Sequence, residues 1–112
     1  MLYVDVDNTL VLWDTVDQEK WKANTAVIDF VRRWALARPD EDIVIWSSGG
    51  LDYARTWGER LLGNKVAWEP MAKGPRGWCG AVIGLGDVTI DDAPFDIWKR
   101  YNVYPDTLEV LQ

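Results

Sequence analysis

The stretch Asp5–Thr9, with the sequence DVDNT, decides how the rest of this chain can be interpreted. It follows the apolar run Leu2–Val4, which is typical of a short buried strand. Because side chains alternate along an extended backbone, Asp5 and Asp7 begin on the same face. Two carboxylates this close repel each other unless a shared proton or a cation relieves them, and Mg²⁺ prefers oxygen ligands.

Three interpretations of this stretch are open. It can be a metal-dependent catalytic site, or a cation site without catalysis. It can also be a polar turn that leaves a strand, because Asp and Asn are common turn residues. The rest of the chain is needed to choose among these interpretations.

The composition excludes several classes of chemistry. The chain has 112 residues, of which 48% are hydrophobic, enough for one domain with a packed core. It has no His and a single Cys, which excludes His-based triads, most zinc sites and an intramolecular disulfide. The net charge is −6 without a basic run, so we expect no broad nucleic-acid-binding surface and no membrane binding. We expect a cytoplasmic protein, since no apolar run reaches the ~20 residues of a membrane span and no signal peptide is evident.

The hydrophobic pattern alternates between strand and helix spacing. We predict helices over residues 24–38, Tyr53–Leu62 and Phe95–Tyr101, and strands over Leu2–Val4, Ile43–Trp46, Val66–Trp68 and Val88–Ile90. This order predicts an α/β fold, a three-layer Rossmann-like arrangement with helices on both faces of a mostly parallel central sheet. We expect a single domain over residues 1–112.

Polar side chains follow three of the predicted strands, and in an open α/β sheet the ligand crevice lies at that end of the strands. The pairs are Asp5 and Asp7, Ser47 and Ser48, and Asp91 and Asp92. Each pair alone is a weak signal, but together they predict a site.

Two details of this site have competing interpretations. The run Leu10–Trp13 is either a flap over the crevice or a core strand. The later acidic element is either Asp87, after a strand over 81–85, or the Asp91 and Asp92 pair. We favour the pair, because Val88–Ile90 is β-branched throughout whereas glycines weaken the alternative strand.

The order of these motifs resembles that of the haloacid dehalogenase (HAD) superfamily of phosphohydrolases. Its first motif is matched by DVDNT, its second by Ser47 after a strand, and its fourth by Asp91 and Asp92. Its third motif is a Lys, best placed at Lys73, with Lys65 as a competitor. The chain also resembles the subset without a cap domain, because only Val11–Ala23 separate the first motif from the first long helix, too little for an inserted domain. It looks like the polymerase carboxy-terminal-domain phosphatases and the polynucleotide-end phosphatases.

The resemblance implies a Mg²⁺-dependent phosphatase that hydrolyses a phosphomonoester through an aspartyl-phosphate on Asp5. Asp7 would be the general acid and base. The implied metal ligands are Asp5, the backbone carbonyl of Asp7, and Asp92, with Asp91 in support. The phosphoryl group would be bound by Ser47, Ser48 and Lys73. For Thr9 we expect only a hydroxyl that bonds nearby backbone.

The substrate class stays open in this interpretation. A phosphorylated protein, a nucleic-acid end and a phosphorylated metabolite are all compatible with the motifs. Two other functions are alternatives to hydrolysis. One is a non-catalytic HAD-like module that binds metal or phosphate, and the other is a phosphotransferase.

Overall fold

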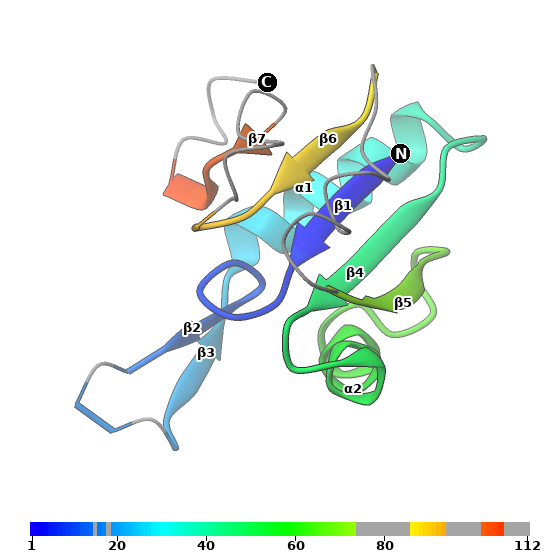
Figure 1. Ribbon diagram of the computed structural model, residues 1–112. Helices are drawn as coiled ribbons and strands as arrows, with labels where there is room; N and C mark the ends of the chain where they lie inside the picture. The colour runs from blue at the N-terminus through cyan, green and yellow to red at the C-terminus, as the bar shows by residue number, and fades with distance from the viewer. Residues whose placement is uncertain (15, 18, 74–85, 94–101, 107–112) are drawn as a thin grey trace.

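A parallel five-stranded sheet forms the centre of the molecule (Figure 1). The computed structural model describes residues 1–14, 16–17, 19–73, 86–93 and 102–106. Its strands are β1 (Leu2–Asp5), β4 (Ile43–Ser47), β5 (Glu69–Ala72), β6 (Val88–Ile90) and β7 (Asn102–Val103). They are ordered β5-β4-β1-β6-β7, and every pair of neighbours is parallel. The predicted α/β fold with a parallel sheet is therefore confirmed.

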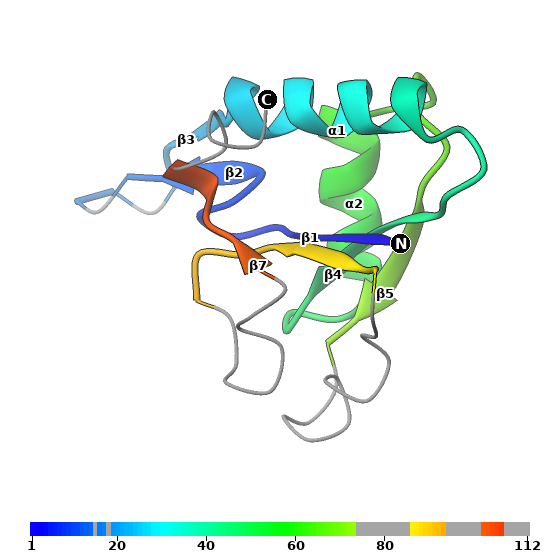
Figure 2. The same cartoon turned by 90° about the horizontal axis from the view of Figure 1, so that it is seen from above.

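Helices α1 (Thr25–Ala37) and α2 (Leu51–Leu61) lie on the same face of the sheet (Figure 2). Alternation along β1 explains the two sides of the core. Leu2 and Val4 pack in one cluster with the buried side chains of both helices, whereas Tyr3 packs against Trp46 on the opposite face. The helix predicted over Phe95–Tyr101 lies outside the described residues.

Both described helices end where the sequence predicts. The Arg38 N–H donates to the Trp34 carbonyl at the end of α1, and Pro39 cannot continue the helix. Gly63 follows α2 with a φ of 58°, a conformation that glycine adopts without steric cost. Its N–H donates to the Gly58 carbonyl and so satisfies one of the last helical acceptors.

The strand predicted over Val66–Trp68 is wrong, because the edge strand β5 begins at Glu69. Pro70 lies inside this strand, which an edge position tolerates because one side of the strand needs no hydrogen-bond donors. Trp68 instead covers α2, and a Cβ on Gly58 would lie 2.3 Å from its ring. Its Nε1 donates to the Gly63 carbonyl at 2.8 Å. The strand β7 was also not predicted.

The segment between β1 and α1 forms an antiparallel hairpin of β2 (Val11–Trp13) and β3 (Trp21–Ala23). Figure 1 shows it projecting from the carboxyl end of β1. Val11 is buried in the core, and Trp13 packs against it, so this segment contributes to the core as one of the two interpretations expected. The role of a flap over the crevice stays a prediction. The part of the chain that the structure describes contains no cap-like domain. Among the described residues, no helix is long and apolar enough to cross a membrane.

Candidate functional site

The carboxyl ends of β1 and β6 bring acidic side chains together. These strands are paired in parallel, with Val4 opposite Ile90, so Asp5 and Asp91 leave the sheet at the same edge. Strand β4 lies on the other side of β1 and ends at Ser47 along that edge. Parallel pairing therefore gathers the end residues of three strands, as the sequence predicted.

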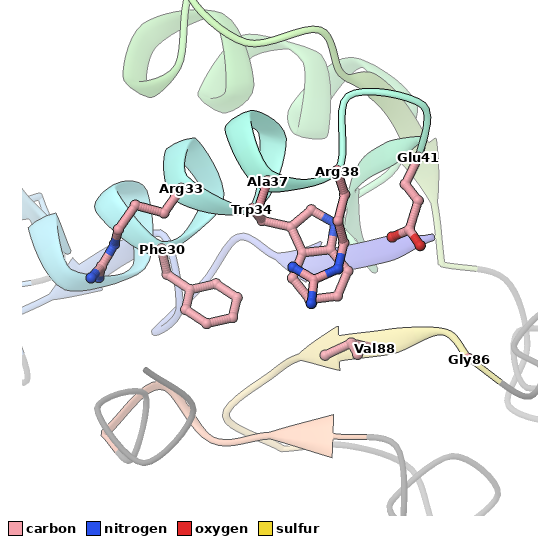
Figure 3. Close-up of a pocket in the computed structure, with 8 residues that line it drawn as sticks. All are labelled: Phe30, Arg33, Trp34, Ala37, Arg38, Glu41, Gly86 and Val88. Atoms are coloured by element: carbon pink, nitrogen blue, oxygen red, sulfur yellow. The ribbon is translucent and has the colours of Figure 1, made fainter.

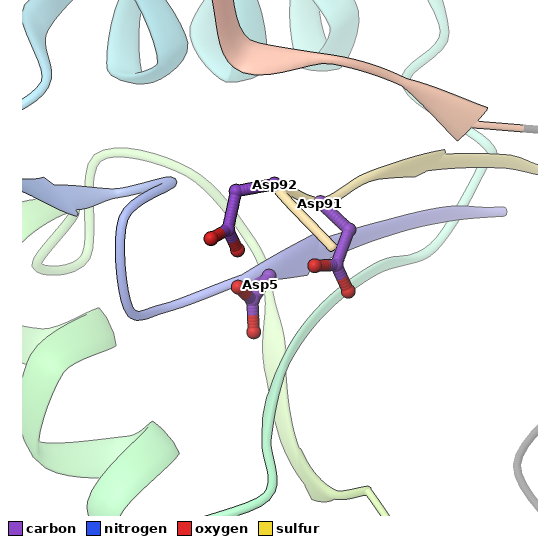
Figure 4. Close-up of side chains that lie close together, drawn as sticks. All are labelled: Asp5, Asp91 and Asp92. Carbon is purple, nitrogen blue, oxygen red and sulfur yellow. The ribbon is translucent and has the colours of Figure 1, made fainter. Parts of the chain in front are cut away.

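Three carboxylates form the centre of this site (Figure 4). Asp5, Asp91 and Asp92 each offer one oxygen, and these oxygens all lie within 4.8 Å of one another. Asp5 and Asp91 are buried, whereas Asp92 is exposed. Mg²⁺ has ligand distances of about 2.1 Å, so oxygens on opposite sides of the ion lie about 4 Å apart. An acidic triad of this size could therefore hold a small divalent cation.

Lys73 connects two of the carboxylates. Its Nζ lies 2.8 Å from Asp5 Oδ1 and 2.6 Å from Asp91 Oδ2, and its side chain is only 7% exposed. The Lys73 N–H donates to the Ser47 carbonyl, which fixes the start of this side chain beside β4. Lys65 is exposed, and its N–H caps the turn after α2. The structure thus brings Lys73, and not Lys65, to the acidic edge.

The described charges at this edge do not balance. Among the residues that the structure describes, three carboxylates face one ammonium, which leaves a formal excess of two negative charges when all groups are ionised. Burial raises the pKa of Asp5 to about 7, against the opposing effect of Lys73, and the charge of Asp91 adds to the rise. Burial also raises the pKa of Asp92. Burial lowers the pKa of Lys73, but Asp5 and Asp91 outweigh it and the net shift is upward.

Thr9 contacts the Asp5 side chain directly. Its Oγ1 donates to Asp5 Oδ2 at 3.2 Å, and the residue is completely buried. The expectation of a bond to nearby backbone is therefore corrected. With Lys73 on Oδ1 and Thr9 on Oδ2, both carboxylate oxygens of Asp5 are held in place.

Asp7 is held by two donors from other elements. Trp13 Nε1 on the hairpin donates to Asp7 Oδ1 at 2.8 Å, and the Tyr53 hydroxyl on α2 donates to the same oxygen at 2.6 Å. Burial and this hydrogen bond to Asp7 raise the pKa of Tyr53. The Asp7 side chain lies outside the group of three carboxylates. Trp13 also packs edge-on against Trp57, so it belongs partly to the core.

The turn after β4 supplies hydroxyl and amide groups. Ser47 is buried, and its Oγ accepts a hydrogen bond from the Gly49 N–H at 3.0 Å. The hydroxyl hydrogen of Ser47 can therefore be donated to another acceptor. Ser48 is exposed beside it. A Cβ on Gly49 would lie 3.0 Å from the Tyr53 ring, so this glycine allows Tyr53 to approach Asp7.

Two residues near the acidic edge were not predicted as part of a site. Tyr53 begins a predicted helix, and its hydroxyl, so soon after Ser47 in the sequence, is the signal that could have placed it near the site. Asn102 gave no signal, because only the pairing of β6 with β7 brings it close. Its Nδ2 donates to the Asp91 carbonyl at 3.0 Å, and its Oδ1 accepts from the Thr89 hydroxyl at 2.8 Å.

Asp87 lies at the other end of β6. The strand spans Val88–Ile90, which confirms the strand chosen from the sequence. Asp87 precedes it, and its Oδ1 lies 2.9 Å from the N-terminal amine of Met1. This aspartate is therefore remote from the acidic edge.

Comparisons of the chain with protein-family models, with curated proteins and with solved structures found no match. The molecule itself shows an α/β domain whose parallel sheet carries an acidic triad that could hold a metal ion. The buried ammonium of Lys73 contacts two of these carboxylates. Asp7 is held by hydrogen bonds from Trp13 and Tyr53. The arrangement can combine cation binding with the attack of a carboxylate and with proton transfer.

Proposed function

We propose that this chain is a Mg²⁺-dependent phosphatase of the HAD type, which hydrolyses a phosphomonoester through a phosphorylated Asp5. One observation carries the proposal. The buried Lys73 bridges Asp5 and Asp91 at 2.8 and 2.6 Å, beside Asp92, at the carboxyl ends of adjacent strands. The order of the sequence motifs supports it, since each matched residue except the Asp7 side chain contributes to one edge.

The donor set suits a hard divalent cation. Asp5, Asp92 and the backbone carbonyl of Asp7 would hold Mg²⁺, with Asp91 in support. The formal excess of two negative charges matches one such ion. When bound, the ion would neutralise and orient the phosphoryl oxygens.

The first chemical step would use Asp5 as the nucleophile. One carboxylate oxygen of Asp5 attacks phosphorus, and the bond from phosphorus to the leaving oxygen breaks. Asp7 donates a proton to that leaving oxygen. Lys73 balances the negative charge of the phosphoryl group, and the Ser47 hydroxyl donates to one of its oxygens. Thr9 and Lys73 keep the attacking carboxylate oriented.

The second step would release inorganic phosphate. Water attacks phosphorus of the aspartyl-phosphate and gives a proton to Asp7, and the bond between phosphorus and Asp5 breaks. The described residues form no cap over this edge, so water would have free access to the intermediate, and hydrolysis is favoured over transfer to another acceptor. Asp92 and Ser48 are both exposed. An open site suits a phosphate group carried on a protein, a nucleic-acid end or a metabolite.

The test is phosphate release from para-nitrophenyl phosphate by the purified protein, followed by a panel of phosphorylated peptides, nucleic-acid ends and metabolites. We expect turnover with Mg²⁺, none with a chelator, and little with Ca²⁺, which prefers more ligands at longer distances. Lys73→Met should lose activity, whereas the matched variant Lys65→Met should keep it. Full activity in chelator would remove the metal from the proposal. Metal binding without turnover on any substrate would instead indicate a non-catalytic binding module.

A further inference from the structure

One face of the hairpin formed by β2 and β3 packs on α2 through aromatic side chains. Trp13 and Trp21 are directly opposite each other in the antiparallel pairing, so both lie on the same face of the hairpin. The buried Trp57 ring on α2 meets both of them edge-on, with its centroid 5.5 Å from that of Trp13 and 4.8 Å from that of Trp21. Aromatic pairs of this kind stabilise beyond the area that they bury. Both strands of the hairpin are therefore fastened to α2 through one ring.

A cation completes this contact. The Arg60 Cζ lies 4.7 Å from the Trp57 ring centroid and 5.4 Å from that of Trp21. Tyr53, Trp57 and Arg60 are spaced at i, i+4 and i+7, so they form a single stripe along α2. Arg60 thus holds the hairpin against one end of this stripe, whereas Tyr53 at the other end donates to Asp7.

The hairpin and the stripe together determine which oxygen of Asp7 can carry a proton. Trp13 Nε1 and the Tyr53 hydroxyl both donate to Asp7 Oδ1, at 2.8 and 2.6 Å. A carboxyl oxygen has two lone pairs, and these two donors use both of them. In the proposed reaction, the proton that Asp7 gives to the leaving oxygen is therefore carried by Oδ2.

We propose that Trp21 and Arg60 are positioning residues for this proton transfer, and that they act through Trp57 and Trp13. They hold the hairpin against α2, the hairpin sets the Trp13 indole on Oδ1, and Asp7 is thereby turned so that Oδ2 faces the leaving oxygen. The inference rests on the proposed phosphatase function for its chemistry, whereas the contacts behind it can be measured without turnover. Loosening the hairpin should slow proton donation and leave substrate binding unchanged.

The experiment compares kcat and KM on butyl phosphate, which has a poor leaving group, and on para-nitrophenyl phosphate, whose leaving group needs little protonation. On butyl phosphate we expect Trp21→Leu to lower kcat by about tenfold and Arg60→Gln by about threefold, from the usual strength of aromatic and cation–π contacts. The KM should stay unchanged, and both losses should be smaller on para-nitrophenyl phosphate. Arg60→Lys keeps a cation over the ring and should restore most of the activity.

A matched control removes the same kind of contact far from Asp7. Arg38 lies over the Trp34 ring of α1, with its Cζ 4.0 Å from the ring centroid, beside Val88 at the amino end of β6 (Figure 3). Arg38→Gln therefore deletes a cation–π contact, as Arg60→Gln does, but at the end of β6 opposite to the acidic triad. It should keep the parental kcat on both phosphates.

A second measurement is independent of turnover. Hydrogen exchange of the Trp13 indole N–H, assigned by its absence in Trp13→Phe, should accelerate in Trp21→Leu and in Arg60→Gln. Arg38→Gln should exchange like the parent, and the melting temperature of each variant shows whether its fold is retained.

Unchanged indole exchange in both hairpin variants, or an equal loss of kcat on the two phosphates, overturns the inference. A parent that hydrolyses neither phosphate removes the proposed phosphatase, and the exchange rates then show separately whether Trp21 and Arg60 order Trp13.

Discussion

The two ends of strand β6 carry aspartates in opposite electrostatic situations. At the amino end, Asp87 faces the N-terminal amine of Met1 at 2.9 Å. At the carboxyl end, Asp91 shares Lys73 with Asp5, and Asp92 lies beside them. Among the residues that the structure describes, the first end thus pairs an aspartate with a cation, whereas the second places three carboxylates, two of them buried, around one ammonium.

This difference suggests a structural role for the charge of Asp87 and a functional role for the carboxylates of the acidic triad. A balanced, partly exposed ion pair contributes little to stability and can be removed at small cost. Buried carboxylates that exceed their cations destabilise the fold, and strongly shifted pKa values of this kind cluster at functional sites. Equal substitutions at the two ends should therefore have very different consequences.

The largest expected difference is in turnover. Asp5→Asn removes the proposed nucleophile and should lower kcat by several orders of magnitude, as loss of a covalent nucleophile does. The fold should persist, because an amide has the same shape and avoids burying a charge. The measurement is hydrolysis of para-nitrophenyl phosphate, with Asp87→Asn as the matched control. Near-parental activity in Asp5→Asn would show that another group attacks phosphorus.

The next difference is in metal dependence. Asp92→Ala removes a proposed ligand, and we expect the Mg²⁺ concentration at half-maximal activity to rise by about 10-fold or more, since even residues behind the ligands cost about 10–100-fold. Asp87→Ala should leave that concentration unchanged and cost at most ~1 kcal/mol of stability. Titration of activity with Mg²⁺ measures both. If Asp87→Ala lost its metal dependence while Asp92→Ala titrated like the parent, the site would have to move to Asp87.

The strands and helices that the sequence predicts correctly are those with a strong apolar pattern. The β1 and β4 runs are almost wholly buried, and the α1 stripe recurs at helical spacing. The edge strands β5 and β7 lack this pattern, because half of their surface faces away from the core. Proline usually ends a strand, and Pro70 is accommodated here because β5 lies at the edge of the sheet.

The sequence could predict those residues of the candidate site that directly follow a predicted strand. Neighbouring parallel strands end at one edge, so Asp5 and Asp91 were expected to meet. Lys73 follows an unpredicted strand, and only the family resemblance indicated it. The contacts of Tyr53 depend on the packing of α2, those of Thr9 on the loop after β1, and those of Asn102 on the packing of β7. The spacing of apolar residues does not encode this packing.

A smaller effect is expected from the groups that orient Asp7. Tyr53→Phe keeps the ring but removes the 2.6 Å hydrogen bond to Asp7. We expect about a 10-fold loss of kcat on alkyl phosphates and a smaller loss on nitrophenyl phosphate, whose leaving group needs little protonation. Tyr3→Phe is the matched control, because the Tyr3 hydroxyl donates to the Met1 sulfur at 3.6 Å. An equal loss on both substrates would count against a role in positioning the general acid.

The last prediction concerns how the stability of the fold depends on pH through Asp5. The pKa of Asp5 is raised from 3.8 to about 7 in the folded protein, chiefly by burial. Between these two values the folded state keeps a proton that the unfolded chain has lost. The folded state therefore binds more protons, and its stability falls as pH rises from about 4 to about 7. The raised pKa of Asp92 acts in the same direction.

The measurement is urea unfolding across this pH range in chelator, for the parent and for Asp5→Asn. The difference between the two curves isolates Asp5 from the other carboxylates, and it should favour the variant increasingly up to about pH 7 and then level off. Mg²⁺ should reduce the difference at high pH, because a bound cation stabilises the ionised parent. A parent whose stability relative to Asp5→Asn rises with pH would mean that Lys73 outweighs burial at Asp5.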